Sequence, residues 1–323
     1  MNILYIVGNG FDLNLGMKTS YSDFYKYYNQ ILSKSPSVLK LKTNISKDIL
    51  NWSDLELALG KYTEKLNSAN EFHEVFEDIG DNLADYLKIQ EDESNCENTK
   101  LDVFFNDLSN PEKYLLTADR NAVYNHKLRH KSNIWTFNIV TFNYTKTIEK
   151  ILGFEELDLT IGEHSGLPNI IHSIEHIHGY TDNRMVMGVN DTSQISNSDF
   201  HNKQDILEAF VKNDCNGICK HTIDQTFSQL ISSANIICIF GSSIGDTDRM
   251  WWNKVANQLK QDCILIIFVK SSEINPRRMY KIGNIERSVK ELIYSHSNLT
   301  IEERSIVDKK IYIGLNSNMF KLD

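Results

Sequence analysis

The chain has 323 residues, of which 41% are hydrophobic and 24% are charged, values that are ordinary for a globular protein with a large buried core. It carries 34 basic and 43 acidic side chains, so its formal charge is −9, and no block of Lys or Arg predicts a nucleic-acid-binding surface. No apolar run approaches the roughly 20 residues of a membrane helix, and the N-terminus lacks a signal-peptide pattern. Five irregularly spaced cysteines favour a reducing compartment, so we expect a cytoplasmic protein without a membrane partner.

The first element is a short apolar run, Ile3–Val7, that stops at Gly8-Asn9-Gly10. Such a run predicts a buried strand, and the two glycines predict a turn at its carboxyl end. Backbone N–H groups in a turn of this kind can bind phosphate, although an ordinary tight turn has the same residues. The common dinucleotide fingerprint is incomplete, because Leu13 occupies the position of its third glycine.

The next segment, residues 21–130, is predicted to be mainly helical. Ser20 and Asp23 form a variant capping box before the first helix, and residues 90–95 are predicted to be a polar loop before a short helix at Leu101–Leu108. Apolar side chains recur every three or four residues in three sets: Tyr21, Phe24, Tyr25, Tyr28 and Ile31; Ile45, Ile49, Trp52, Leu55, Leu59 and Tyr62; Phe72, Val75, Phe76, Ile79, Leu83, Tyr86 and Leu87. We therefore expect a helical insertion or cap at residues 21–130, attached to a nucleotide-binding core formed by residues 1–20 and 131–323.

Strands are predicted again from residue 136 onward. A helix at Leu207–Ile231, with a break near residues 213–214 or 216–217, and a helix with Trp251, Trp252, Val255 and Leu259 alternate with these strands. Five apolar runs predict strands, at residues 136–142, 170–177, 236–240, 264–269 and 310–315, and Met185–Val189 predicts a further paired strand. This alternation predicts an α/β fold whose parallel sheet is covered on both faces.

Polar residues or glycines follow several of these strands. They are Gly8-Asn9-Gly10, Asn143, Gly241-Ser242-Ser243 and Lys270-Ser271. Ligands of open parallel sheets bind at the carboxyl ends of strands, so these groups predict one shared crevice. Gly241 to Asp246 would form a second loop facing phosphate or ribose, and Asp246 could instead serve only as a helix N-cap.

Two side chains are candidates for catalysis. The Asn143 amide could hold a ribose hydroxyl or a water, or it could simply cap a turn. His178 is a candidate general base, because imidazole titrates near neutral pH, and a structural role is the alternative. His172, His176 and His178 would face the same side of one strand, and Cys215, Cys219 and His221 form a zinc-like fragment. Neither set is complete enough to predict a metal.

The ordered motifs VGNGFD, TSYSDF, NWSDLE, TFNYT, HIHG and FGSSIGDTD resemble those of the AbiH family of bacterial phage-abortive-infection proteins. That family distantly resembles sirtuin-like NAD-binding domains, which implies a Rossmann-like sheet of the sirtuin type. The resemblance assigns the strand-end amide to Asn143 and the base to His178. It assigns the cofactor-binding loops to Gly8, Asn9, Gly10 and Phe11, and to Gly241, Ser242 and Ser243.

Some features depart from the sirtuin pattern. Tyr144 and Thr145 stand where sirtuin deacylases carry an acid, and a four-cysteine zinc module is not visible, which argues against protein deacylation. Asp12 has no obvious counterpart, so ribose binding, helix capping and catalysis all remain open for it.

These features predict an antiphage effector that hydrolyses NAD to nicotinamide and ADP-ribose, with NAD as substrate or ligand and no metal. The alternatives are a non-catalytic sensor that binds NAD or ADP-ribose and controls a partner, and a metal-dependent nuclease. A second copy of the chain and a phage-derived trigger are candidate partners.

Overall fold

The computed structural model describes residues 1–94, 100–153, 158–274 and 276–322. Its centre is a seven-stranded sheet in the order β3-β4-β2-β1-β5-β6-β7. The strands are β1 (Asn2–Val7), β2 (Trp135–Thr141), β3 (Leu159–His164), β4 (Leu167–His176), β5 (Ile236–Phe240), β6 (Ile264–Val269) and β7 (Ile311–Leu315). Strand β3 is antiparallel to β4, and the other neighbours pair in parallel. The predicted α/β fold with a mostly parallel sheet is confirmed.

The parallel strands follow the order 3-2-1-4-5-6 when they are numbered along the chain without β3. This is the order of a doubly wound sheet, in which the chain builds outward from the first strand to one side and then to the other. Strand β1 lies at the point of reversal, with β2 on one side and β5 on the other. The turn after β1 therefore occupies the position where such sheets bind ligands.

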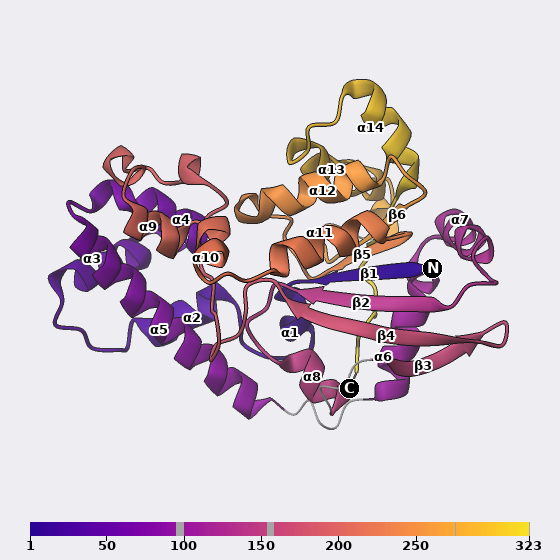
Figure 1. Cartoon of the computed structure of the whole chain (residues 1–323), viewed down its shortest axis with the longest axis horizontal. Helices are drawn as coiled ribbons and strands as arrows, with labels where there is room; N and C mark the ends of the chain where they lie inside the picture. The colour runs from indigo at the N-terminus through magenta and orange to yellow at the C-terminus, as the bar shows by residue number, and fades with distance from the viewer. Residues whose placement is uncertain (95–99, 154–157, 275, 323) are drawn as a thin grey trace.

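Helices cover both faces of the sheet (Figure 1). Alternate residues of β1 explain this, because Ile3 and Tyr5 pack into one hydrophobic cluster while Leu4 and Ile6 pack into another. The first cluster contains side chains from α6 (Leu101–Ser109), α7 (Thr117–Leu128) and α8 (Thr147–Leu152). It also contains Phe11 from α1 (Gly10–Asn14). The second includes α11 (Ile223–Ser233), α12 (Arg249–Gln258), α13 (Lys281–Ser295) and α14 (Ile301–Val307).

The remaining helices form a group beyond the carboxyl ends of the strands (Figure 1). These helices, which we call the helical layer, are α2 (Tyr21–Tyr28), α3 (Pro36–Lys47), α4 (Leu55–Tyr62), α5 (Ala69–Glu93), α9 (Gln204–Phe210) and α10 (Lys212–Ile218). A third hydrophobic cluster joins most of them, and it includes Phe72 of α5 and Phe210 of α9, whose rings are 5.5 Å apart. The layer thus draws on two separate parts of the chain, and the predicted division into residues 21–130 and a core stays a prediction.

Several local predictions differ from the structure. Met185–Val189 forms no strand. Val186 N–H donates to the carbonyl of His178 in a loop, and Val189 N–H donates to the carbonyl of Phe210 at the end of α9. Helix α5 continues to Glu93, through most of the predicted polar loop, and Asn95 lies outside the described residues. The apolar set 45–62 is split into α3 and α4 by a turn, and the helix expected at 207–231 is divided into α9, α10 and α11.

The side chain of Ser20 accepts a hydrogen bond from Asp23 N–H, as predicted for the first cap. Within the described residues, no helix is both long enough and apolar enough to cross a membrane.

Candidate functional site

A cleft of about 450 Å³ lies between the carboxyl ends of the central strands and the helical layer. The turns after β1, β2 and β5 line it, together with His178 from the loop after β4. The site residues predicted from the sequence that line this cleft are Gly8, Asn9, Gly10, Asp12, Asn143, His178, Gly241, Ser242 and Ser243. Lys270 and Ser271 were expected in the same crevice, but they line a separate hollow with residues 316–318, because β6 lies one strand farther from the point of reversal.

Two glycine turns meet at the base of the cleft. A Cβ on Gly10 would lie 2.5 Å from the Cα of Gly241, and a Cβ on Gly8 would lie 2.7 Å from the Gly241 oxygen. Gly8 N–H donates to Phe240, and Gly10 N–H donates to Gly241. The glycines therefore permit close contact between the β1 and β5 turns, and these two N–H groups already have protein acceptors.

Two of the predicted cofactor-binding side chains do not line the cleft. Phe11 is buried in the core, where its ring packs edge-on against Phe104, Phe240 and Phe320. Asp246 is exposed, and its carboxylate lies 2.9 Å from His296 Nε2. The 3₁₀ turn formed by Asp246–Asp248 directs Asp248, rather than Asp246, into the cleft.

Asn143 and Asp12 form a buried polar cluster on the cleft wall. Asp12 is 1% exposed, and its Oδ2 accepts a hydrogen bond of 2.6 Å from the Thr145 hydroxyl. The Thr147 hydroxyl lies 3.0 Å from the Thr145 hydroxyl. In contrast, Asp12 Oδ1 and Asn143 Oδ1 are buried without a hydrogen-bond partner among the described residues. Two buried acceptors of this cluster thus lack a hydrogen-bond partner from the described residues.

Burial of Asp12 has a consequence for stability. Desolvation by burial raises the pKa of its carboxyl, and hydrogen bonds with Thr145, Thr147 and Asn143 lower it. The net result is a pKa raised from 3.8 to about 6. The folded state therefore binds a proton more tightly than the unfolded state, so this group's contribution to stability is lost as pH rises from about 4 to about 6.

We therefore expect Asp12→Asn to stabilise the fold at pH 7.5 by up to about 3 kcal/mol, because the substitution removes a buried charge. The gain should vanish near pH 4, where the wild-type carboxyl is protonated. Urea unfolding at both pH values would measure it. A variant that is less stable than wild type at pH 7.5 would show that the charge is favourable where it stands.

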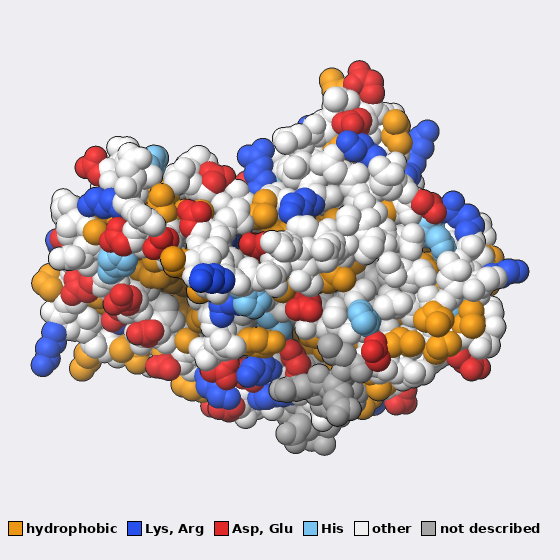
Figure 2. All heavy atoms as spheres, viewed as in Figure 1, with side chains coloured by type: hydrophobic (Ala, Val, Ile, Leu, Met, Phe, Trp, Pro, Cys, Tyr) orange, Lys and Arg blue, Asp and Glu red, His pale blue; other side chains and the backbone are white. Residues whose placement is uncertain are grey.

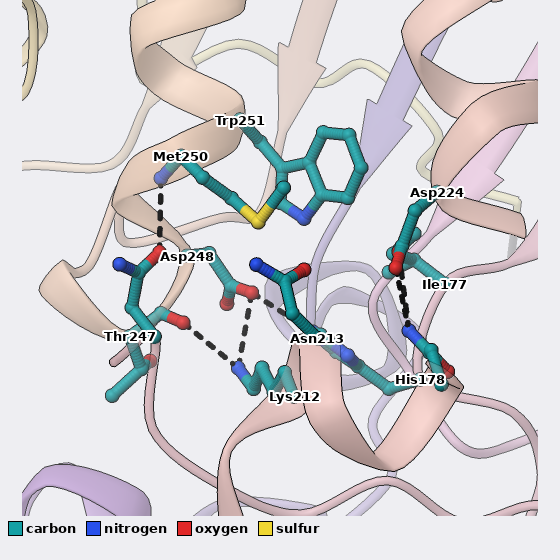
Figure 3. Close-up of a pocket in the computed structure, with 11 residues that line it drawn as sticks. Ile177, His178, Lys212, Asn213, Asp224, Thr247, Asp248, Met250 and Trp251 are labelled. Atoms are coloured by element: carbon teal, nitrogen blue, oxygen red, sulfur yellow. Dashed lines mark hydrogen bonds and ion pairs between the residues drawn. The ribbon is translucent and has the colours of Figure 1, made fainter. Parts of the chain in front are cut away.

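His178 lies in a network of buried charges, part of which, Lys212 and Asp248, is seen in a small pocket next to the cleft (Figure 3). Its Nε2 is 3.1 Å from Asp248 Oδ1, a separation suited to an ion pair, although the two groups are not aligned as a hydrogen bond. Lys212 Nζ donates to Asp248 Oδ1 at 3.0 Å and to Glu56 Oε2 at 2.9 Å. Glu56 in turn accepts from the Tyr144 hydroxyl at 3.4 Å.

Electrostatics within this network keep Asp248 and Lys212 charged. Burial alone would raise the pKa of Asp248, but Lys212 and His178 hold it well below its usual range. Burial would likewise lower the pKa of Lys212, yet Asp248 and Glu56 raise it. The network thus joins α4, α10 and the turn after β5 to the imidazole of His178.

The turn after His178 depends on a glycine. Gly179 has φ of +72°, and a Cβ there would lie 2.0 Å from the carbonyl oxygen of Arg184. We expect Gly179→Ala to destabilise the protein by about 2–4 kcal/mol, through backbone strain and a steric clash. Thermal unfolding would measure it beside Gly217→Ala, where an added Cβ meets nothing within 4 Å. Equal melting temperatures for the two variants would contradict this explanation.

Comparison with known families identifies the chain. The sequence profile described as "bacteriophage abortive infection AbiH" matches residues 4–269, which includes all of the cleft-lining residues. The chain belongs to the AbiH family. This membership gives it a role in phage abortive infection. A search of curated proteins finds no match.

Sequence reasoning assigned no role in the buried network to three charged residues, Glu56, Lys212 and Asp248, although Glu56 and Asp248 stand in the NWSDLE and FGSSIGDTD motifs. Glu56 and Lys212 are separated by 156 positions, and neither belongs to a local motif that predicts their contact. One signal was present, because Lys212 directly follows the apolar pair Phe210-Val211 and Glu56 lies inside an apolar helix. Charged residues in such positions are rarely buried unless they are paired.

His172, His176 and His178, which the sequence places on one strand, have separate partners in this AbiH protein. His172 is exposed and lies 2.7 Å from Asp158, whereas His176 is buried between the Asn143 carbonyl and Glu149. His176 therefore helps to fix the Asn143 backbone. Across the described residues, no group of three or more His, Cys, Asp or Glu side chains is arranged to hold a metal.

The charge of the AbiH cleft is distinctive. Its lining includes the acids Asp12, Asp54, Glu56 and Asp248, whereas Lys212 reaches it only through ion pairs with two of them. On the face of the molecule that Figure 2 shows, the basic side chains of the described residues are mixed with acidic ones and do not form a basic band. The cleft is therefore better suited to a cationic or hydroxyl-rich group than to a polyanion.

Proposed function

We propose that this AbiH protein hydrolyses NAD, releasing nicotinamide and ADP-ribose, and that this reaction is its means of abortive infection. The observation that carries the proposal is the cleft itself, where Asn143, Asp12 and His178 surround a volume suited to a small molecule. The cleft lies at the reversal point of a doubly wound sheet, the usual site of nucleotide binding.

A sirtuin-like arrangement supports this choice. The sirtuin-like pattern includes an Asn at the end of a strand, a His-Gly pair and a Gly-Ser loop, and in this chain the three follow β2, β4 and β5. These are Asn143, His178-Gly179 and Gly241-Ser242. The resemblance supports NAD as the ligand, and the missing acid after Asn143 supports hydrolysis rather than protein deacylation.

The acidic lining suits the nicotinamide half of NAD. Its ring is cationic, and the sugar gains positive charge as the glycosidic bond lengthens, so nearby carboxylates stabilise the transition state. The diphosphate would lie beside the β1 and β5 turns. Ser242 Oγ accepts from Ile244 N–H, which leaves its hydroxyl proton free to donate to a phosphate oxygen.

The reaction needs water and one proton acceptor. The C1′–N bond breaks with its electron pair leaving on nicotinamide, which departs neutral, while a water oxygen bonds to C1′ and releases a proton. Asn143 would position the water or the ribose, and His178 would act as a base toward a ribose hydroxyl or that water. Asp248, held by Lys212, would fix and stabilise the imidazole.

The proposal is tested by incubating purified protein with NAD and measuring nicotinamide, both alone and with extract from phage-infected cells. Wild-type protein should release nicotinamide and ADP-ribose in equal amounts, and His178→Ala should release neither. NAD that stays intact under conditions in which the protein is toxic would contradict the proposal.

The same samples distinguish the alternatives. Tight NAD or ADP-ribose binding by calorimetry, without turnover in either condition, would favour a sensor that controls a partner. Plasmid degradation that requires a divalent metal and survives Asn143→Ala would favour a nuclease.

A further inference from the structure

We propose that Asp54 makes this cleft select NAD over nicotinic acid adenine dinucleotide, the analogue with a carboxylate in place of the carboxamide on the pyridinium ring. The inference rests on the proposed NAD hydrolysis and concerns the choice of substrate. Its basis is the charge of the cleft: the described residues that line it include four Asp or Glu side chains and no Lys or Arg. The two dinucleotides carry the same diphosphate, so they differ only in the charge and hydrogen bonding of the ring substituent.

Asp54 presents a free carboxylate oxygen to the cleft. It precedes α4, and its Oδ1 accepts a hydrogen bond of 3.0 Å from Leu57 N–H as the cap of that helix. Its Oδ2 has no hydrogen-bond partner among the described residues, yet it is not enclosed by protein, because the half-buried side chain lines the cleft. A Cβ on Gly245 would lie 3.7 Å from Oδ2, so this oxygen faces the turn after β5.

The neighbouring acids add to the negative potential at Asp54. Glu56 and Asp248 share one cation, Lys212, whose Nζ lies 2.9 Å from Glu56 and 3.0 Å from Asp248. These three groups carry one net negative charge, and Asp54 adds a second. Burial raises the pKa of the Asp54 carboxyl, and the charge of Glu56 raises it further. A ligand carboxylate beside Asp54 would meet like charge, whereas a cationic ring would relieve the repulsion.

The pyridinium ring falls on this side of the cleft in the proposed reaction. The ring is bonded to C1′, so it lies within one sugar of His178. His178 Nε2 is 3.1 Å from Asp248, the last residue of the 3₁₀ turn whose N-cap is Gly245, and Gly245 is the residue that Asp54 faces. The carboxamide N–H groups can then donate to Asp54 Oδ2, whereas a carboxylate has no N–H to donate. Both the lost hydrogen bond and the repulsion act against the analogue.

The test compares kcat/KM for the two dinucleotides, measured as release of nicotinamide or nicotinic acid. Wild-type protein should favour NAD by about 100-fold, and Asp54→Asn should narrow that preference to less than about tenfold, because it removes the charge and puts an amide donor in place of Oδ2. Asn keeps the helix cap, so the variant should remain folded by thermal melting. Asp85→Asn, at an exposed position of α5 outside the cleft lining, should keep the wild-type preference. Comparing each variant with wild type cancels the intrinsic difference between the two leaving groups.

The outcomes separate this inference from the proposed function. Equal use of the two dinucleotides by wild-type protein, or a folded Asp54→Asn protein that keeps the full preference, would overturn the role of Asp54 alone. If wild-type protein releases nothing from NAD, the proposed hydrolysis fails, and calorimetry with the same two dinucleotides decides the inference. Tighter binding of NAD that Asp54→Asn narrows would uphold it, and equal or absent binding would overturn it as well.

Discussion

Asn143→Ala is expected to lower the rate of NAD hydrolysis by about 100–1,000-fold, the usual cost of removing one preorganised polar group from an active site. Its amide is buried beside Asp12, and its Oδ1 has no partner within the described chain, so its removal should leave the fold intact and the chemistry impaired. Initial rates of nicotinamide release, compared at saturating NAD, would measure the effect.

Two further variants sharpen this prediction. Asn202→Ala, at an exposed position in the turn before α9, should match wild type, which controls for handling and expression. Asn143→Asp keeps an acceptor but loses the amide donors and adds a buried charge beside Asp12, so it should also be slow. An Asn143→Ala protein within threefold of the wild-type rate would remove Asn143 from the mechanism.

Lys212→Met is expected to destabilise the protein by about 3–5 kcal/mol, the range for removing one partner of a buried ion pair. The substitution would leave Glu56 and Asp248 as neighbouring buried carboxylates with no cation between them. Urea unfolding monitored by tryptophan fluorescence would measure the change. Lys88→Met provides a matched control, because Lys88 pairs with Asp92 on an exposed surface and should cost less than about 1 kcal/mol.

The pH dependence gives this second prediction its own check. Lys212 and His178 hold the folded-state pKa of Asp248 down, so this pair's stabilisation is present above the normal carboxyl pKa and is lost as pH falls through the lower value. The cost of Lys212→Met should therefore shrink in acid. The double variant Lys212→Met with Glu56→Gln should recover part of the loss at pH 7.5, and full additivity of the two changes would contradict a shared network.

The parts of the fold that the sequence predicts are those with local signals. The Ile3–Val7 run predicts a strand because all of its residues are apolar, and it forms β1 at the centre of the sheet. The convergence of Gly8, Asn143 and Gly241 follows from a general rule, since the carboxyl ends of adjacent parallel strands meet at one edge. Lys270 also follows a parallel strand, but it lies outside the cleft because β6 is one strand farther from β1 than β5. The sequence does not predict this, because the order of the strands cannot be deduced from the strands alone.

The parts that the sequence does not predict depend on contacts between distant segments. Met185–Val189 has a strand-like composition, yet two of its N–H groups donate to the loop residue His178 and to Phe210 at the end of α9 instead of to a neighbouring strand. Phe11 belongs to the first glycine loop by motif, but the first turn of α1 directs its ring into the core. The pairing of Lys212 with Glu56 needs the helical layer to be assembled first, and no local pattern encodes that.

The most direct test of this account is chromatography of NAD after incubation with wild-type and Asn143→Ala protein, in the presence and absence of extract from phage-infected cells. The account predicts equal amounts of nicotinamide and ADP-ribose from wild-type protein and about 100–1,000-fold slower release of both from the variant. Intact NAD in every sample, from wild-type protein shown to be toxic under the same conditions, would contradict it.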